Sequence, residues 1–270
     1  MKKLIVFTDL DGTLLHHDTY DWTPALPAIN LLKQHGFPLV LNSSKTSSEI
    51  KQLRKKLAND APYICENGAV VHFNEQMKGD VEDSMAVIYF AKPYAYIKQV
   101  LDDIKKNYHF DMFGFDDIDV KTLMDLTELD ETSARAAKQR EATEPLVWND
   151  NAESLDNFVR LLNKQGLTLT KGGRFHHVIS PVSKGESIKW LIEKYQEMEP
   201  ETQWVTAGLG DSFNDISMLE QVDYPVLIKN PHGKKPNVAH IANLVESKLQ
   251  GPAGWNVEVT DIIKTITGTG

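Results

Sequence analysis

Cysteine is nearly absent from this sequence of 270 residues, because Cys65 is the only one. A single cysteine cannot form a disulfide within the chain, which excludes a fold held together by internal cross-links. We therefore expect a protein of the reducing cytoplasm that an apolar core stabilises. Free cysteines are usually buried, so we expect Cys65 to be one of the core residues.

Long hydrophobic runs are missing as well. No apolar run approaches the roughly 20 residues that a membrane-spanning helix needs. The first residues, MKKLIVF, are like the start of a secretion signal, but Asp9 and Asp11 follow them too soon for the apolar region of such a signal. We expect a soluble protein with no membrane partner.

Positive charge is scarce: 29 lysines and arginines stand against 38 acids, for a formal net charge of -9. This balance excludes a broad nucleic-acid-binding surface but leaves room for a local basic pocket that binds a small anion. Hydrophobic residues make up 41% of the chain and charged residues 25%, as in ordinary folded proteins. The length suits one large domain, or a core with a second domain inserted into it.

The two ends of the sequence share a pattern in which short apolar segments alternate with amphipathic ones. Residues 1–84 predict the order strand, helix, strand, helix, strand, and residues 182–270 resume the alternation. This order is typical of a parallel sheet with helices on both faces. Residues 85–181 differ and suit helices on one face of an open sheet, beginning with the strand AVIYFA. We therefore predict an α/β domain, 1–84 with 182–270, and an inserted α+β domain, 85–181.

Two acids end the first apolar strand, in the stretch IVFTDLDGTLL. Asp9 and Asp11 are two residues apart, so both can approach one centre where the strand ends. Ligands of open parallel sheets bind at the carboxyl ends of the strands, and Gly12 permits a tight turn there. Adjacent carboxylates repel each other, and a hard cation such as Mg²⁺ keeps both ionised. A solvated acidic turn is the ordinary alternative, and we favour the metal site.

A second acidic turn follows a strand in GLGDSFNDISML. Ser212 and Asp215 have the spacing of a capping box, which by itself indicates only a well-capped helix. Asp211 precedes the cap and is not needed for capping. We expect Asp211 and Asp215 to lie beside Asp9 and to complete the Mg²⁺ site.

Two further residues suit the binding of an anion. Ser43 ends the strand FPLVLNS, ahead of a helix that a capping box of Thr46 and Glu49 begins. Lys184 begins the helix SKGESIKWLIEKY, where it can reach phosphate oxygens. Each residue alone is weak evidence, because capping serines and surface lysines are common.

Together and in this order, DLDGT, Ser43, Lys184 and GDSFND resemble the motifs of the haloacid dehalogenase superfamily. The resemblance covers the whole chain, and the large insert between the second and third motifs is similar to a type C2 cap. ENGA, at residues 66–69, is similar to a loop of the members with a C2B cap. The resemblance implies a Rossmann-like parallel-sheet core with an inserted α+β cap.

The same resemblance implies a role for each motif residue. Asp9 would attack phosphorus and form an aspartyl-phosphate, and Asp11 would act as general acid and base. Ser43 and Lys184 would hold the phosphoryl oxygens. The Mg²⁺ site would comprise Asp9, Asp11 through its backbone carbonyl, Asp211 and Asp215, with Gly12, Ser212 and Asn214 in support.

The inserted segment carries QREATEP and, later, GGRF, which are similar to segments of the mannosyl-3-phosphoglycerate phosphatases; KNPHG, at 229–233, is similar to another. This resemblance implies hydrolysis of 2-O-mannosyl-3-phosphoglycerate to mannosylglycerate, a compatible solute. Arg140 and Arg174 suit a carboxylate, and Glu141, Thr143 and Glu144 can accept hydrogen bonds from sugar hydroxyls. The candidate substrate contacts are Ser44, Glu66, Asn67, Arg140, Glu141, Thr143, Arg174 and His176, or His177 in place of its neighbour.

Other interpretations stay open. The arginines of the insert also suit solvated helix positions. Another C2-capped sugar-phosphate phosphatase, for example one that acts on sucrose phosphate, would carry the same core motifs, and so would a phosphomannomutase-like phosphotransferase. A non-catalytic phospholigand-binding protein would have no need of both Asp9 and Asp11, which are present.

Overall fold

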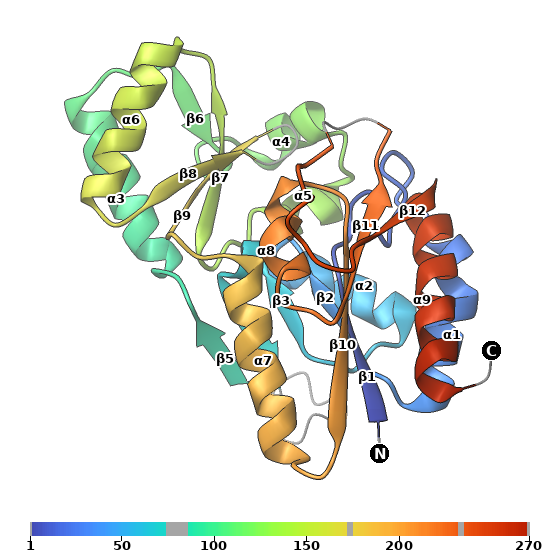
Figure 1. Ribbon diagram of the computed structural model, residues 1–270. Helices are drawn as coiled ribbons and strands as arrows, with labels where there is room; N and C mark the ends of the chain where they lie inside the picture. The colour runs from blue at the N-terminus through green and yellow to red at the C-terminus, as the bar shows by residue number, and fades with distance from the viewer. Residues whose placement is uncertain (1, 74–85, 172–174, 232–234, 269–270) are drawn as a thin grey trace.

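The larger domain is built around a sheet of eight strands (Figure 1). The computed structural model describes residues 2–73, 86–171, 175–231 and 235–268. In spatial order the strands are β12 (Val245–Gln250), β11 (Tyr224–Lys229), β10 (Gln203–Gly210), β1 (Lys2–Thr8), β2 (Leu39–Asn42), β3 (Tyr63–Cys65), β4 (Val70–Phe73) and β5 (Ala86–Tyr89). The strands from β12 to β3 are parallel, and β4 and β5 are antiparallel to their neighbours.

Helices cover both faces of this sheet because its central strand is apolar on both sides. Leu4, Ile5, Val6 and Phe7 of β1 are all fully buried, and alternate residues point to opposite faces. The face of Leu4 and Val6 packs against α1 (Leu26–His35), α2 (Ser47–Leu57) and α9 (Gly251–Thr267). The face of Ile5 and Phe7 packs against α7 (Lys184–Met198) and α8 (Ile216–Leu219). Figure 1 shows α7 on one side of β1 and β10 and the neighbouring helices α1 and α9 on the other.

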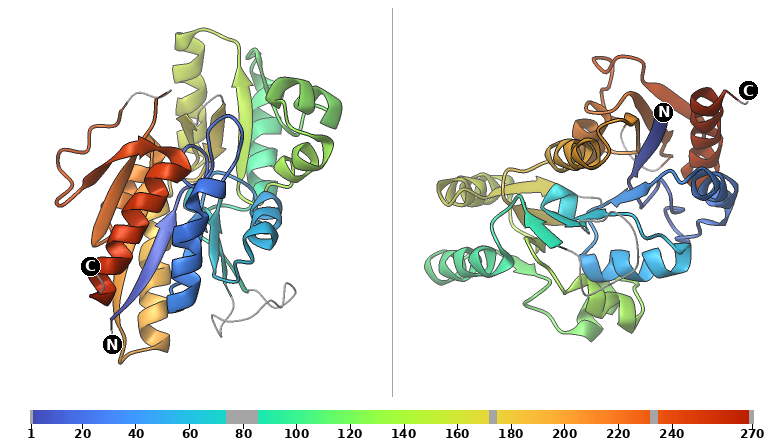
Figure 2. Two further views of the ribbon diagram at one scale, coloured as in Figure 1. Left: turned by 90° about the vertical axis from the view of Figure 1, so that its right-hand side faces the viewer. Right: turned by 90° about the horizontal axis from the view of Figure 1, so that it is seen from below.

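The inserted segment forms a separate antiparallel sheet. Its strands are β6 (Met112–Gly114), β7 (Thr143–Trp148), β9 (His176–Ile179) and β8 (Thr168–Lys171), in that spatial order. The helices α3 (Tyr94–Asn107) and α6 (Ala152–Lys164) pack on one face of this sheet and share its apolar core. Figure 2 shows this layer beside the larger sheet rather than stacked on it.

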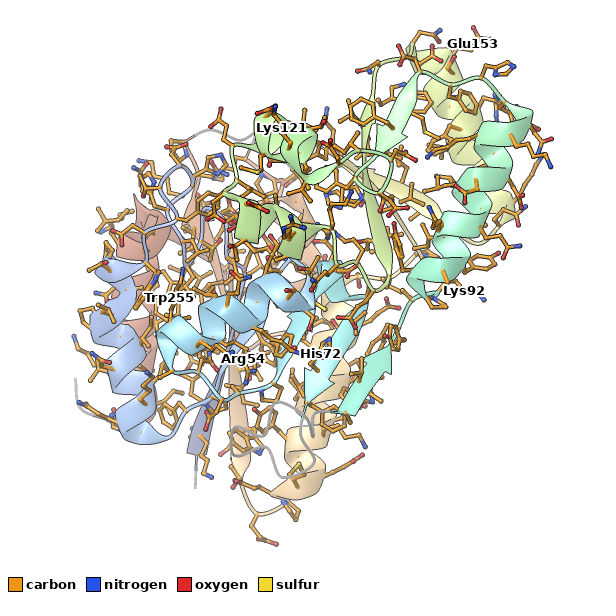
Figure 3. All side chains as sticks on the ribbon, turned by 180° about the vertical axis from the view of Figure 1, so that it is seen from behind. Arg54, His72, Lys92, Lys121, Glu153 and Trp255 are labelled. Carbon is orange, nitrogen blue, oxygen red and sulfur yellow. The ribbon has the colours of Figure 1, made fainter. Side chains whose placement is uncertain are left out.

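Two short helices of the insert pack on each other, and one of them contacts the larger domain. α4 (Val120–Thr127) and α5 (Glu131–Ala137) share a small apolar cluster that includes Phe115. α5 contacts α2, and Oγ1 of Thr46 donates a hydrogen bond to the carbonyl of Ala136 at 2.9 Å. The chain enters and leaves the insert through neighbouring segments, because the amide of Lys92 donates to Oγ of Ser180 at 2.8 Å. Lys92 is labelled at this junction in Figure 3.

Several expectations hold in the structure. The strands and helices alternate as expected in the larger domain, and Cys65 is fully buried in its core. Thr46 and Glu49 form the expected capping box of α2. None of the helices in the described ranges is long and apolar enough to cross a membrane.

Segment 86–89, predicted as the first strand of the insert, is instead the edge strand of the larger sheet. The reason is β4, which the sequence pattern did not predict and which gives β5 an antiparallel partner. The chain reverses before β4 at Glu66, Asn67 and Gly68, whose φ angles are all positive. The expected parallel sheet is therefore present from β12 to β3, and β4 and β5 extend it as antiparallel strands at one edge. We place the start of the insert after Tyr89 as a proposal.

Other differences concern short or polar elements. The acidic stretch FDDIDVKTLMDL contains α4, which the side chain of Asp119 caps, and β12 was also not predicted. The helix expected over SFNDISMLEQV is reduced to a 3-10 turn, Phe213–Asp215, and the four residues of α8. α5 ends at Ala137, so Arg140 lies beyond this helix and does not take the solvated helix position that was the alternative for it. Capping, tight turns and edge pairing override the simple periodicity in these places.

Candidate active site

A buried lysine lies between two carboxylates at the carboxyl ends of β1 and β10. Asp9 follows β1, Asp215 lies in the turn after β10, and Lys184 is the first residue of α7. Nζ of Lys184 donates to Oδ1 of Asp9 at 2.6 Å and to Oδ1 of Asp215 at 2.7 Å. The side chains of Lys184 and Asp215 have no exposed area, and that of Asp9 is 8% exposed. The structure thus brings together three residues that are far apart in the sequence.

Burial and charge control the protonation of this group. Burial raises the pKa of Asp9 well above its usual value, and the attraction of Lys184 offsets only part of that effect. Burial lowers the pKa of Lys184, but Asp215 and Asp9 more than compensate and raise it, so the lysine stays protonated. Burial, with the nearby Asp215, raises the pKa of Asp211 to about 7. In the absence of a cation, burial and mutual repulsion therefore favour the protonated forms of Asp9 and Asp211.

Asp211 and Asp215 are held by short contacts of the turn that follows β10. Oδ2 of Asp215 accepts hydrogen bonds from the amides of Asp211 and Ser212, both at 3.0 Å, so the expected capping box is present. Oδ1 of Asp211 accepts from Thr13 at 3.3 Å, and Oδ2 accepts from Nδ2 of Asn230 at 2.5 Å. Both oxygens of Asp215 are thus engaged, and its clearest role is to hold Lys184.

Gly12 is needed where the first acidic loop approaches the second. Its φ is +82°, and a Cβ built on it would lie 2.6 Å from Oδ2 of Asp211. An L-residue with a side chain would be strained by the backbone angle and would also displace the carboxylate. The requirement for glycine in DLDGT is therefore both conformational and steric.

The donor set of the site suits a hard divalent cation. Asp9, Asp211 and Asp215 each offer a carboxylate oxygen, and these atoms lie within 4.8 Å of one another. A bound Mg²⁺ would stabilise the ionised forms of these carboxylates and would find in them the oxygen ligands that it prefers. The side chain of Asp11 does not belong to this group of donors.

Asp11 pairs with Lys45, a residue that the sequence patterns did not indicate. Nζ of Lys45 lies 3.0 Å from Oδ2 of Asp11 and over the ring of Tyr20. Oδ1 of Asp11 is buried and has no hydrogen-bond partner within the described residues. Burial lowers the pKa of Lys45, but the attraction of Asp11 and then Glu49 raises it, so it remains charged. The sequence feature that could have indicated Lys45 is its place directly before Thr46, the capping residue of α2, in NSSKT.

Ser43 lies just after β2 and is 1% exposed. Its Oγ accepts a hydrogen bond from the amide of Lys45 at 3.3 Å, and its carbonyl accepts from the amide of Asn67 at 2.9 Å. The next residue, Ser44, accepts a hydrogen bond at its carbonyl from Arg140 at 3.0 Å. The loop after β2 therefore links the larger domain to the insert.

Most candidate substrate contacts in the insert already have protein partners. Arg140 is half-buried, and its Nε donates to the carbonyl of Ala137 at 2.9 Å. Oε1 of Glu141 lies 3.2 Å from Nε2 of His72, a residue of β4 that is labelled in Figure 3. Oε1 and Oε2 of Glu144 accept from the amide of Asp116 and the hydroxyl of Tyr94, both at 2.9 Å. Glu144 is therefore a structural residue of the insert rather than an open acceptor.

Glu66 and Asn67 lie between the two sheets. The Glu66 carboxylate accepts hydrogen bonds from Glu141, Ala142 and Thr143, so it is not free for a sugar. Oδ1 of Asn67 accepts from Nδ2 of Asn214 at 3.0 Å, which places both asparagines at the edge of the acidic site.

The two histidines of β9 have different environments. His176 is half-buried, whereas His177 is 8% exposed, and burial lowers the pKa of His177 to about 3. Arg174 lies outside the described residues, as do residues 232 and 233 of KNPHG. Asn230 of the same loop is described, and its bond to Asp211 was not predicted. Asn230 could have been found because it follows β11, the strand that pairs with β10.

The chain matches the family of haloacid dehalogenase-like hydrolases over residues 6–248. A glucosyl-3-phosphoglycerate/mannosyl-3-phosphoglycerate phosphatase of Methanococcoides burtonii is 38% identical over 268 residues, 97% of each chain. A protein of the same name from Persephonella marina is 36% identical, over 97% of this chain and 98% of its own.

Solved structures share the fold at lower sequence identity. A protein of Thermoplasma acidophilum superposes with a TM-score of 0.68 at 18% identity and covers 99% of each chain. A haloacid dehalogenase-like hydrolase of Bacteroides thetaiotaomicron gives 0.67 at 19%, over 98% of this chain and 100% of its own. These likenesses show the fold alone.

Proposed function

This chain belongs to the family of haloacid dehalogenase-like hydrolases, and we propose that it is a Mg²⁺-dependent phosphatase of mannosyl-3-phosphoglycerate. The product would be mannosylglycerate. The proposal of substrate rests on the two phosphatases above, which resemble this chain over nearly its full length. The names of both proteins also include glucosyl-3-phosphoglycerate, so the glucosyl compound is the first alternative substrate.

The main support for a phosphatase reaction is that Lys184 forms two buried ion pairs, one with Asp9 and one with Asp215. A phosphatase of this kind needs a carboxylate nucleophile that is fixed in place and a cation that faces the transferred group. Lys184 holds Asp9 at 2.6 Å in a region where the side chain of Asp9 is 8% exposed. An ordinary structural ion pair would not need further acids around it, yet Asp211 and Asp11 stand nearby.

The reaction would proceed in two displacements at phosphorus. An oxygen of Asp9 forms a bond to phosphorus while the ester P–O bond breaks, and Asp11 gives its proton to the departing alkoxide. Asp11 then takes a proton from water as the water oxygen attacks the aspartyl-phosphate, which releases phosphate and restores Asp9. The pairing of Asp11 with Lys45 keeps one oxygen in place and leaves Oδ1 for this proton.

Asp9, Asp211 and the backbone carbonyl of Asp11 would hold Mg²⁺, with Asp215 close by. The ion would supply positive charge to the phosphoryl oxygens during transfer. Ser43, at the end of β2, would donate its hydroxyl to one of these oxygens, and Lys184 would face another. Ser212 and Asn214 would keep the turn after β10 in position.

The insert would act as a cap that recognises the leaving group. We propose that it begins after β5 and ends near residue 181, so that the core is formed by the segments on either side. Arg140 and Arg174 remain our candidates for the glycerate carboxylate, and His176 for a sugar contact. We also propose a cytoplasmic location, since the only cysteine is a buried core residue whose thiol pKa burial raises.

Phosphate release from a panel of esters tests the proposal. The panel contains mannosyl-3-phosphoglycerate, glucosyl-3-phosphoglycerate, 3-phosphoglycerate, mannose 6-phosphate and sucrose 6-phosphate, with Mg²⁺ or with EDTA. We expect Mg²⁺-dependent release with a strong preference for the first compound or the first two. Asp9→Asn should abolish release, while the control Asp60→Asn, an exposed acid of the same domain, should not. A preference for a hexose phosphate, or transfer without release of phosphate, would overturn the substrate or the reaction type.

A further inference from the structure

Three consecutive residues between β3 and β4 have left-handed backbone angles. The φ angles of Glu66, Asn67 and Gly68 are 53°, 60° and 93°. A positive φ is uncommon for residues other than glycine, and such a conformation persists only when its surroundings fix it. The surroundings of this turn therefore need to be identified.

The backbone of the turn contacts loops that carry active-site residues. The amide of Glu66 donates to the carbonyl of Lys45 at 3.0 Å, and that of Asn67 donates to the carbonyl of Ser43. A Cβ on Gly68 would lie 2.4 Å from the carbonyl oxygen of Ser183, the residue before Lys184. The turn is thus fixed between the loop after β2 and the start of α7.

The side chain of Glu66 extends from this turn to the insert. Oε1 accepts a hydrogen bond from the amide of Glu141 at 2.6 Å. Oε2 accepts from the amide of Ala142 at 3.0 Å and from Oγ1 of Thr143 at 2.6 Å. Glu66 has no exposed area, and charge-assisted bonds of this kind are about twice as strong as neutral ones.

The segment that Glu66 holds controls two parts of the insert. Thr143 is the first residue of β7, the strand that pairs with both β6 and β9. Arg140 directly precedes the segment, and its guanidinium donates to the carbonyl of Ser44, beside Ser43. A shift of residues 141–143 would therefore move the sheet of the insert and Arg140 together.

We propose that Glu66 is a positioning residue that sets where the insert stands relative to the phosphoryl site. It does so by fixing residues 141–143 to a turn that is itself tied to Ser43 and the start of α7. This inference rests on the proposed phosphatase function. It predicts that Glu66 affects substrates whose leaving group touches the insert, and leaves small phosphoesters largely unaffected.

Glu66→Gln is the informative variant. Glutamine keeps the size of the side chain, but its NH₂ group would face an N–H or O–H donor where an oxygen now accepts. We expect kcat/KM for the best ester of the panel to fall at least about tenfold, because charge-assisted bonds are lost. Hydrolysis of p-nitrophenyl phosphate, whose leaving group is small, should stay within about twofold of the wild type.

Glu144→Gln is the matched control. Glu144 is also buried and also accepts hydrogen bonds at both oxygens, but its partners Asp116 and Tyr94 all belong to the insert. A general loss of stability would appear in both variants, whereas a change in the ratio of the two activities should appear only in Glu66→Gln. Thr143→Val removes one donor to Glu66, together with the acceptor of a longer bond from Arg140 at 3.4 Å, and should change the ratio in the same direction, but less.

Amide hydrogen exchange provides a readout that does not depend on activity. The amides of Glu141 and Ala142 should exchange faster in Glu66→Gln and at the wild-type rate in Glu144→Gln. The inference would be overturned if Glu66→Gln left the ratio of the two activities unchanged, whether or not both fell. Unchanged exchange at the amides of Glu141 and Ala142 would also overturn it. If Glu66→Gln does not fold, Thr143→Val decides on the same criteria. If the wild type releases phosphate from no ester, the proposed function fails, while the exchange data still test the placement of the insert.

Discussion

Removal of the buried positive charge at Lys184 gives a quantitative test of the acidic site. Lys184→Met keeps an unbranched side chain of similar length but deletes the ammonium group that binds Asp9 and Asp215. All three side chains are at least nine-tenths buried. The variant therefore leaves two carboxylates in a region from which water is largely excluded.

Breaking a buried ion pair by removing one partner costs about 3–5 kcal/mol. Lys184 serves two carboxylates, so we expect the free energy of unfolding to fall by an amount near the upper end of that range, about 4–5 kcal/mol, in EDTA at neutral pH. Part of the loss should return when Mg²⁺ is added, since the ion binds the folded acids and not the unfolded chain.

The loss should also depend on pH. Burial already raises the pKa of Asp9 in the wild type, and it should be higher still without Lys184. A carboxylate with a raised pKa in the folded state holds its proton more tightly than in the unfolded state. Its penalty is therefore small at low pH and grows as the pH rises through the normal range of carboxylates.

Urea unfolding of wild type and Lys184→Met, each at pH 5 and pH 7.5 with EDTA or Mg²⁺, measures these effects. Lys189→Met is the control, because Lys189 lies on the same helix and is exposed. The reasoning would be refuted if Lys184→Met in EDTA were as stable as the control at pH 7.5. It would also be refuted if the variant lost more stability at pH 5 than at pH 7.5.

Three further results are expected. Burial lowers the pKa of His177 to about 3, so the folded state binds fewer protons than the unfolded one. His177 by itself should therefore lower the unfolding free energy by about 2 kcal/mol between neutral pH and pH 5. Asp9 and Asp211 act in the opposite direction, so the test is the difference between variants: in the same urea titration His177→Gln should be less destabilised at pH 5 relative to pH 7.5 than the wild type is. Gly12→Ala should destabilise by about 1–3 kcal/mol and weaken Mg²⁺ binding in calorimetry, because of its backbone strain and the clash with Asp211. Asp11→Asn should accumulate phosphoenzyme from p-nitrophenyl phosphate in a quench assay, because that leaving group departs without a proton whereas the second step lacks its base.

The central site could be predicted because each of its residues follows a strand or begins a helix. Asp9 follows β1 and Asp211 follows β10. These two strands pair in parallel, so the residues after their carboxyl ends lie close together. Lys184 was indicated as the start of a helix, and the structure places it between Asp9 and Asp215. The roles in catalysis came from the family resemblance rather than from spacing.

The remaining features depend on contacts between distant segments, which periodicity does not reveal. In the sequence, Lys45 is only a residue beside the start of a helix, and its contact with Asp11 becomes visible only in the folded structure. Glu66 was expected to bind substrate, whereas its carboxylate is satisfied by residues 141–143. β5 has an alternating pattern that suits the edge of either sheet, and only the unpredicted β4 decides which one it joins.

The most direct test of the account is to identify the group that becomes phosphorylated. Enzyme mixed with mannosyl-3-phosphoglycerate and Mg²⁺ is quenched in acid within milliseconds, reduced with borohydride and digested. The account predicts that an aspartyl-phosphate is reduced at Asp9, which would then be found as homoserine in that peptide. The account would be contradicted if the phosphorylated residue were not Asp9. It would also be contradicted if the enzyme hydrolysed the ester without any residue becoming phosphorylated.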